Sequence, residues 1–307
     1  MTGQTSHSPA YARQTGPASQ LAPALAVVAG IGIFSVMDAA VKSASIVMGV
    51  YTALLLRNVL ATVFSLPLWL ASRQPLPRRR ILRLHAWRAG IITIMALLFF
   101  YGLLHIPMAE AIAISFVAPI VALFLAALLL GEVIRPRAIV ASLFGIAGVV
   151  TIGSGRLGGF EQSPGSLTGI LALLGSALFY AYNLILQRQQ ALLAAPAEIA
   201  LFQNLFSTLF VALPAPWLAT LPGASGWGMV AAAGLLATCA HLCFSWAYAR
   251  AETQVLLPLE YSAFPWAALM GWLFFRENVT LTTMAGAALI VAGCWIGTRN
   301  NISQPPS

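Results

Sequence analysis

Charged residues are scarce in this sequence, and their scarcity limits the classes of protein that it can encode. Only 8% of its 307 residues are charged, whereas a soluble domain usually carries about 25%. Hydrophobic residues make up 60% of the chain, which is more than the core of a water-soluble protein requires. These proportions exclude a soluble globular protein and predict a chain that lies largely in a membrane.

Cysteine and acidic residues are also few. The three cysteines, Cys239, Cys243 and Cys294, all fall in apolar runs and are interpreted as small core residues. His241 lies between the first two but on another helix face, so no metal site is predicted. The sequence has no nucleotide-binding loop, and no nucleophile beside an identifiable base. We therefore predict neither catalytic residues nor a cofactor, and no ATP-driven reaction.

The net charge of +8 comes from clustered basic residues rather than from a nucleic-acid site. Six arginines fall within residues 73–88, and Trp87 is the only aromatic residue among them. Basic loops of membrane proteins stay in the cytoplasm. This segment is therefore interpreted as a cytoplasmic anchoring loop, and nucleic acid is not a predicted partner.

Apolar runs of about 20 residues recur from Leu21 to Ile296, and each is long enough to cross a hydrocarbon core of about 30 Å as a helix. The first run is interpreted as a retained span, because no small-residue cleavage site follows it closely. The predicted spans are residues 21–42, 47–70, 87–105, 107–130, 138–153, 168–187, 198–218, 227–249, 254–275 and 279–297. The fold class is thus an all-α membrane protein with about ten transmembrane helices.

The positions of lysine and arginine predict how these spans are oriented. With the amino terminus inside, twelve basic residues fall on the cytoplasmic side and three outside, and Arg57 is left within the membrane. Because basic residues are enriched in cytoplasmic loops, we expect both termini to be cytoplasmic.

Two segments share a pattern that indicates an internal repeat. In residues 119–148 a proline precedes Glu132 by thirteen residues and a glycine follows it by sixteen; around Glu277, in residues 265–293, these separations are twelve and sixteen. Each copy would hold five spans, and because five is odd, the second copy would be inverted in the membrane. Chance similarity between two apolar helices is the alternative.

The paired GE and RE turns at Glu132 and Glu277, each followed by a Gly/Ala-rich helix, and the arginine inside the second span resemble the drug/metabolite transporter superfamily, specifically its EamA-type members. The resemblance covers nearly the whole chain, although Ala141 stands where the second copy has Gly286. It implies ten spans in two inverted five-helix repeats, and a secondary carrier of small metabolites in the bacterial inner membrane. Such carriers often export amino acids or related compounds.

An uptake carrier is the alternative within the same family. Residues 38–42 and 258–261 resemble members that take up S-adenosylmethionine-like and vitamin-like solutes. Two other classes are weighed: a membrane-embedded lipid-modifying enzyme would need clustered acids, and a channel would need rings of like polar groups. The acids here are scattered singly, which favours a carrier that works by alternating access.

The repeat also divides the chain into predicted domains. The expected parts are a disordered cytoplasmic tail (1–20), the first five-helix repeat (21–153), a periplasmic linker (154–167), the second repeat (168–298) and a cytoplasmic tail (299–307).

Ionisable residues within the predicted spans are candidates for function, because a charge in hydrocarbon is costly unless it is paired or hydrated. Asp38 and Lys42 lie four residues apart on one helix face. Lys42 is near the end of its span, so we expect it to extend to the interface. Arg57 lies deeper and could meet Asp38 if the first two helices are neighbours. The three are candidate ion-pair residues, with a structural role and a substrate role both open.

Glu260 is the main candidate of the second half. It lies about six residues into the ninth span between Pro258 and Pro265, where a kink could open a polar cavity. Its carboxyl could carry a proton as the cavity alternates between the two sides, so protons are considered as the coupling ion. His241 shares a helix face with Ser245 and could share that proton, or could simply pack.

Further polar and aromatic side chains could line the same cavity or pack against neighbours. Trp266 lies near mid-span, but on an ideal helix it would face away from Glu260. The candidate residues of the translocation pathway are Asp38, Arg57, Tyr101, Tyr180, Asn183, His241, Glu260 and Trp266.

Glycines and turn acids are given structural roles. Glu132 and Glu277 are expected to cap the helices that follow them and not to bind substrate. Close helix packing is predicted at Gly145, Gly148, Gly286 and Gly293.

Overall fold

The computed structural model describes residues 21–118, 120–121, 124–125, 136–157, 165–220, 226–251 and 256–298. These residues form helices and no strand, which confirms the all-α class. The helices are α1 (Leu21–Met48), α2 (Val50–Ala71), α3 (Arg79–His105), α4 (Met108–Ser115), α6 (Pro136–Leu157), α7 (Ser166–Leu193), α8 (Pro196–Ala212), α9 (Ala215–Leu218), α10 (Trp227–Arg250), the 3-10 helix η2 (Leu257–Ser262), α12 (Ala263–Phe275) and α13 (Leu281–Thr298).

Five of the described helices, α1, α2, α3, α7 and α10, are long and apolar enough to cross a membrane. The other predicted spans correspond to shorter helices or lie partly outside the described residues. The predicted span 254–275, for example, is divided into η2 and α12.

The third span is longer than predicted. Its helix α3 begins at Arg79 and not at residue 87, so part of the predicted basic loop is helical. Arginine is a good helix former, and the basic residues of this turn are therefore compatible with a helix that continues past the apolar stretch.

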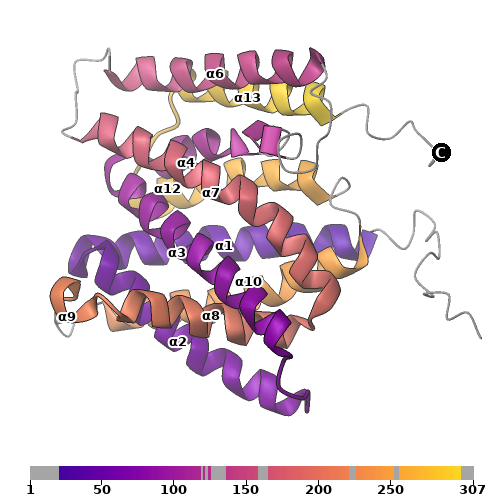
Figure 1. The fold of residues 1–307 in the computed structure, drawn as a ribbon. Coiled ribbons are helices and arrows are strands. Elements are labelled where there is room, and N and C mark those ends of the chain that lie inside the picture. Colours follow the sequence, from indigo (N-terminus) through magenta and orange to yellow (C-terminus); the bar gives the residue numbers. More distant parts are fainter. Residues whose placement is uncertain are drawn as a thin grey trace, which may run out of the picture.

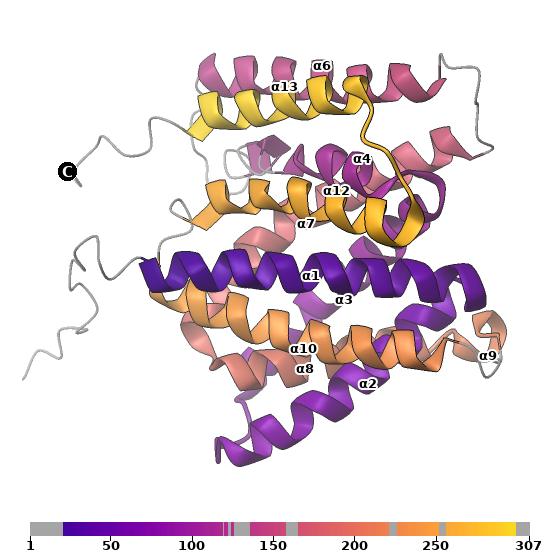
Figure 2. The same ribbon diagram turned by 180° about the vertical axis from the view of Figure 1, so that it is seen from behind.

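The helices pack in layers across the bundle (Figure 1). Helices α6 and α13 run side by side along one edge, α4 and α12 follow, and α1 separates these from α2, α8 and α10, whereas α3 and α7 run obliquely across the layers. The start of α1, the end of α13 and the connection between α2 and α3 lie toward the same end of the bundle, while α9 lies at the opposite end (Figures 1 and 2). The two ends of the described chain are therefore on one side.

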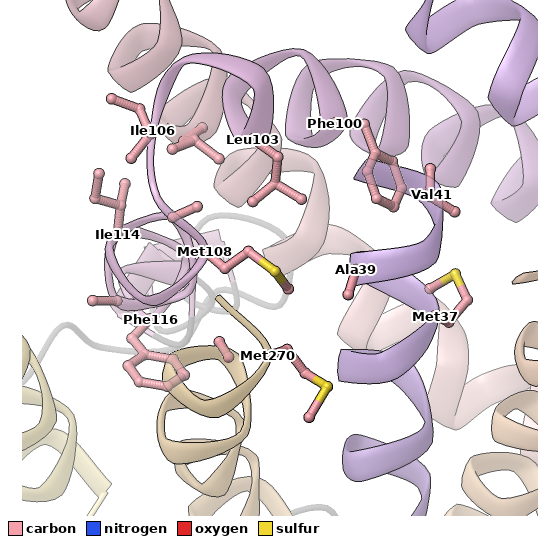
Figure 3. Close-up of a cluster of buried hydrophobic side chains, with 14 of the residues drawn as sticks. Met37, Ala39, Val41, Phe100, Leu103, Ile106, Met108, Ile114, Phe116 and Met270 are labelled. Atoms are coloured by element: carbon pink, nitrogen blue, oxygen red, sulfur yellow. The ribbon is translucent and has the colours of Figure 1, made fainter. Parts of the chain in front are cut away.

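The main apolar core joins helices of both halves of the chain (Figure 3). Met37 of α1, Phe100 and Leu103 of α3 and Met108 of α4 are almost fully buried, and Met270 of α12 packs in the same cluster. Between membrane helices such side chains leave lipid and not water, so their close packing, and not their removal from water, ties α12 of the second half to α1, α3 and α4 of the first.

Glycines allow α6 and α13 to approach closely. A Cβ atom added at Gly148 would lie 2.6 Å from the carbonyl oxygen of Gly286, and one added at Gly286 would lie 2.6 Å from that of Gly148. A Cβ atom at Gly145 would lie 2.6 Å from Ile120 Cδ1, and Gly293 is buried. The two backbones therefore meet where neither helix has a side chain, as in other small-residue contacts of membrane helices.

We expect Gly148→Ala to destabilise the protein by about 1–3 kcal/mol, because the new methyl group would clash with the backbone of α13, which cannot change rotamer as a side chain can. Gly228→Ala is the matched control. Gly228 is also a helical glycine, but an added Cβ atom there has nothing within 4 Å, so its thermal unfolding midpoint should stay equal or rise slightly. Thermal unfolding in detergent measures both variants. Equal midpoints for the two would contradict the close contact.

Candidate functional site

A cavity of about 230 Å³ lies among helices of both halves of the chain. Its volume approaches the lower limit of roughly 300–1,000 Å³ for ligand pockets, which suits a small metabolite. Aromatic rings, including those of Phe34, Phe99, Phe116 and Phe244, form much of the apolar wall. The ionisable residues that line the cavity are Asp38, Arg57, Arg88, His241 and Glu260.

The structure brings most of the predicted pathway residues to this cavity and leaves two outside. Tyr180 and Asn183 line it together with four of the ionisable residues predicted above. Tyr101 does not: its side chain is 41% exposed, and its hydroxyl lies 3.5 Å from Thr168 Oγ1. Trp266 instead packs over Gly32 of α1, with ring atoms 3.2 Å from the position of an added Cβ.

Asp38 and Arg57 face the cavity without forming an ion pair. Lys42 pairs with Glu277 instead, and the ring of His85 lies 3.0 Å from Glu198 Oε1, so neither contact involves Asp38 or Arg57. One terminal nitrogen of Arg57 donates to Asn58 Oδ1 at 2.8 Å, and its buried Nε has no hydrogen-bond partner in the described chain. The Arg57 guanidinium is therefore held by the amide of Asn58, and its other N–H groups remain available as hydrogen-bond donors.

Lys42 does not extend to the interface as predicted from the sequence. It is 6% exposed, forms an ion pair with Glu277 and lies over the ring of Phe275, 4.6 Å from the ring centroid. The prediction was wrong because it considered α1 alone, whereas the turn after α12 folds back and supplies a partly buried carboxylate, whose side chain is 18% exposed.

Glu277 also caps a different helix from the one expected. Its Oε2 accepts the Met108 N–H at 2.8 Å, at the start of α4, whereas the N–H of Thr283 in α13 is capped by Thr280 Oγ1 at 3.1 Å. A threonine hydroxyl at this position is a common helix cap, so α13 does not need the acid. Glu132, the matching acid of the first half, lies outside the described residues.

Arg88 is the important cavity residue that the sequence prediction missed. It was assigned to the cytoplasmic loop with five other arginines, yet it is 3% exposed and lines the cavity. The other five, Arg73, Arg78, Arg79, Arg80 and Arg83, are exposed. Helical spacing was the available signal, because Arg88 shares a face with the cavity-lining residues Ile92, Met95 and Phe99.

Glu260 is fixed in the cavity wall by two tyrosines. Tyr180 donates to its Oε2 at 2.5 Å, and Tyr248 donates to its Oε1 at 2.6 Å. Such short O–H···O bonds are typical of a charged acceptor and offset part of the cost of burying the carboxylate. Tyr248 was not predicted, although it lies seven residues after His241 and therefore on the same face of α10.

The amino-acid sequence matches the model of the EamA-like transporter family over residues 18–154 and again over residues 167–298. The chain belongs to this family. The double match means that each half of the EamA-like protein carries one copy of the family unit, as the proline–acid–glycine spacing predicted.

Relatives with assigned functions agree with this membership. The chain is 29% identical over 273 residues to the pseudopaline exporter CntI of Pseudomonas aeruginosa, covering 88% of this chain and 93% of the relative. It is 24% identical to a riboflavin transporter of Brucella anthropi, covering 76% and 82%. It is 30% identical to the aromatic amino acid exporter YddG of Ancylobacter novellus, covering 53% and 55%.

A solved structure shares the fold of this EamA-like protein. The match covers 94% of this chain and 99% of the other chain, with a TM-score of 0.61 and 21% sequence identity. This match shows the fold alone. The apolar helices, the family match and the relatives identify a multi-pass membrane protein that transports a small metabolite.

Proposed function

We propose that this EamA-like protein is a secondary transporter that exports an amino acid or a related compound across the bacterial inner membrane by alternating access. The observation that carries the proposal is the composition of the cavity. Asp38 and Arg57 come from the first half, His241 and Glu260 come from the second, and all four line one space. Charged groups are kept in a membrane bundle mainly where they meet a partner, water or a substrate.

Alternating access follows from the position of this cavity between the two repeats. In transporters built from inverted repeats, the substrate site lies at the repeat interface, and rocking of one repeat against the other exposes it to each side in turn. The aromatic wall and the mixed charges of the cavity suit a small amphipathic solute. They do not suit a long lipid chain. The family and the relatives' names likewise favour a transporter over an enzyme.

Export is favoured because two of the relatives are named as exporters. Uptake of a vitamin-like solute is the second candidate, and it is supported by the relatives named as riboflavin transporters. The two directions are separated by measuring retention of the labelled solute in cells with and without the gene.

Protons are the proposed coupling ion, with Glu260 as the residue that carries them. Glu260 is 8% exposed and lines the cavity, so it meets water when the cavity opens and is dry when the cavity closes. A carboxyl in such a position can take up a proton on one side and release it on the other. Both oxygens keep their tyrosine partners in the described state.

Exchange in proteoliposomes tests the proposed function. Vesicles loaded with unlabelled L-phenylalanine are expected to accumulate external labelled L-phenylalanine transiently and with saturation, whereas vesicles with the Arg57→Gln variant should not. A panel of other amino acids and riboflavin extends the test to the alternatives. Uptake that rises linearly with concentration for every solute would contradict a carrier.

Both termini are proposed to be cytoplasmic, which can be tested with single cysteines in a cysteine-free background. Leu76 lies between α2 and α3 and is 75% exposed, and Trp217 lies in α9 and is 81% exposed. The two segments lie toward opposite ends of the bundle (Figure 2). We expect an impermeant thiol reagent to label Trp217→Cys and not Leu76→Cys in intact cells, and both after the membrane is opened. The reverse pattern in intact cells would invert the topology.

A further inference from the structure

Two buried arginines face the cavity, and neither has a carboxylate within ion-pair distance among the described residues. Arg57 is 7% exposed and Arg88 is 3% exposed, and neither takes part in an ion pair among the described residues. A guanidinium stays charged in any protein environment. The cavity wall therefore carries two permanent positive charges, one from α2 and one from α3, and neither guanidinium is within ion-pair distance of a carboxylate of the described residues.

The partners of Arg88 are all neutral amides of α7. Its Nε donates to Asn183 Oδ1 at 2.9 Å, one terminal nitrogen donates to Gln187 Oε1 at 3.0 Å, and the other donates to Gln190 Oε1. Three of its five N–H groups are thus used. The amides orient the guanidinium but supply no negative charge, and two donors remain for an anion.

A second layer of contacts fixes this arrangement from behind. Gln190 also contacts His85 Nδ1, and His85 Nε2 lies 3.0 Å from Glu198 Oε1. Gln190 and His85 are fully buried, and Glu198 is 7% exposed. Because the rotamer of Gln190 is held by His85, the fork of Arg88 is held at the cavity wall, as expected of a prearranged binding group.

The acids of the cavity balance the two arginines. Both oxygens of Glu260 accept a tyrosine hydroxyl, and a carboxylate has further acceptor capacity. Asp38 lies on the cavity and makes no hydrogen bond to the described residues. Two guanidiniums and two carboxylates give a lining of balanced charge, which complements a solute that carries both signs.

We propose that the cavity recognises a zwitterion with two acidic groups, in which Arg57 and Arg88 each bind one oxyanion and Asp38 binds the ammonium group. This inference rests on the proposed transport function and names the substrate class within it. The rings of Phe34 and Phe99 contact the apolar part of the solute. Arg88 is the residue that distinguishes a solute with a second acid from a simple amino acid.

Two probes that differ only in the second acid test this assignment. They are γ-L-glutamyl-L-phenylalanine and its carboxy-terminal amide, measured by thermal shift on the purified full-length protein, which reports binding to the folded state. The wild-type protein should bind the dicarboxylate at least about tenfold more tightly than the amide, since a charge-assisted hydrogen bond is lost in the amide. Equal affinities would overturn the proposal, and this comparison requires no variant.

Variants then assign the preference to a residue. Arg88→Gln should reduce the ratio of the two affinities to within about twofold while the amide still binds, and Arg57→Gln should weaken both probes. Arg88→Lys should recover part of the preference, because it restores the charge but not the fork. A ratio that is unchanged in Arg88→Gln would overturn the role of Arg88.

The outcome is separable from that of the transport assay. If neither probe shifts the wild-type protein while L-phenylalanine is exchanged in proteoliposomes, the two-acid class is wrong and the carrier function stands. If no solute is exchanged but the dicarboxylate binds with the expected ratio, the substrate class stands and the carrier function is wrong.

Discussion

Replacing Glu260 with glutamine is expected to abolish accumulation driven by a proton gradient while leaving exchange of labelled for unlabelled solute largely intact. Glutamine keeps the shape of the side chain, and its amide can hydrogen-bond to the hydroxyls of Tyr180 and Tyr248, which now hold the carboxylate. It cannot carry a proton. The steady-state accumulation ratio should therefore fall to about one, because uphill movement requires that the proton and the solute move together.

Glu198→Gln is the matched control for this variant. Glu198 is also a buried acid, but it pairs with His85 and does not line the cavity. Its loss could alter affinity through Arg88 but should leave the accumulation ratio unchanged, since that ratio depends on coupling alone. For Glu260→Gln, loss of exchange together with binding would instead identify a substrate ligand, and unchanged accumulation would leave Glu260 a structural acid.

Lys42→Met is expected to destabilise the protein by about 1–3 kcal/mol, less than the range of about 3–5 kcal/mol for a fully buried ion pair, because the side chain of Glu277 is 18% exposed. Glu277 would keep its negative charge and its bond to the Met108 N–H but lose the ammonium group. Glu277→Gln should cost less, since the glutamine oxygen can still accept that N–H. The thermal unfolding midpoint and the denaturant midpoint in detergent measure both changes.

The double variant Lys42→Met/Glu277→Gln separates pairing from independent effects. It should be more stable than the sum of the single changes predicts, because no unpaired charge is left. Arg276→Gln is the control, since this neighbouring residue is exposed and its change should stay within about 0.5 kcal/mol. Additive losses in the double variant would show that the two charges do not stabilise each other.

Hydropathy predicted the helical class and the approximate positions of the spans, because burial in lipid requires long apolar helices whatever their partners are. It predicted ends less well. The basic start of α3 was read as a loop, since the rule that basic residues lie outside the membrane does not tell where a helix begins. Because Arg88 is the last of these arginines, it was assigned to the loop and was not predicted to line the cavity.

The sequence could not predict which side chains contact each other across different helices. Lys42 and Glu277 are 235 residues apart, and no spacing rule along one helix connects them. Glu260, Arg57 and Asp38 were found because an ionisable residue inside an apolar run is unusual by itself. Tyr101 and Trp266 were poorer candidates, because aromatic residues are common at the surface and at packing contacts of membrane helices.

The amide partners of Arg88 affect the order in which the chain can enter the membrane. These amide residues lie 95 to 102 residues after Arg88 in the sequence. The ribosome therefore completes α3 well before it synthesises α7. Until α7 arrives, the guanidinium has no acceptors and must stay near the water interface, which α3 allows because its first turns carry exposed arginines. Helix α3 can reach its final depth only after the second half has begun to insert. The first half made alone would therefore lack the side-chain acceptors that hold Arg88 in the complete protein.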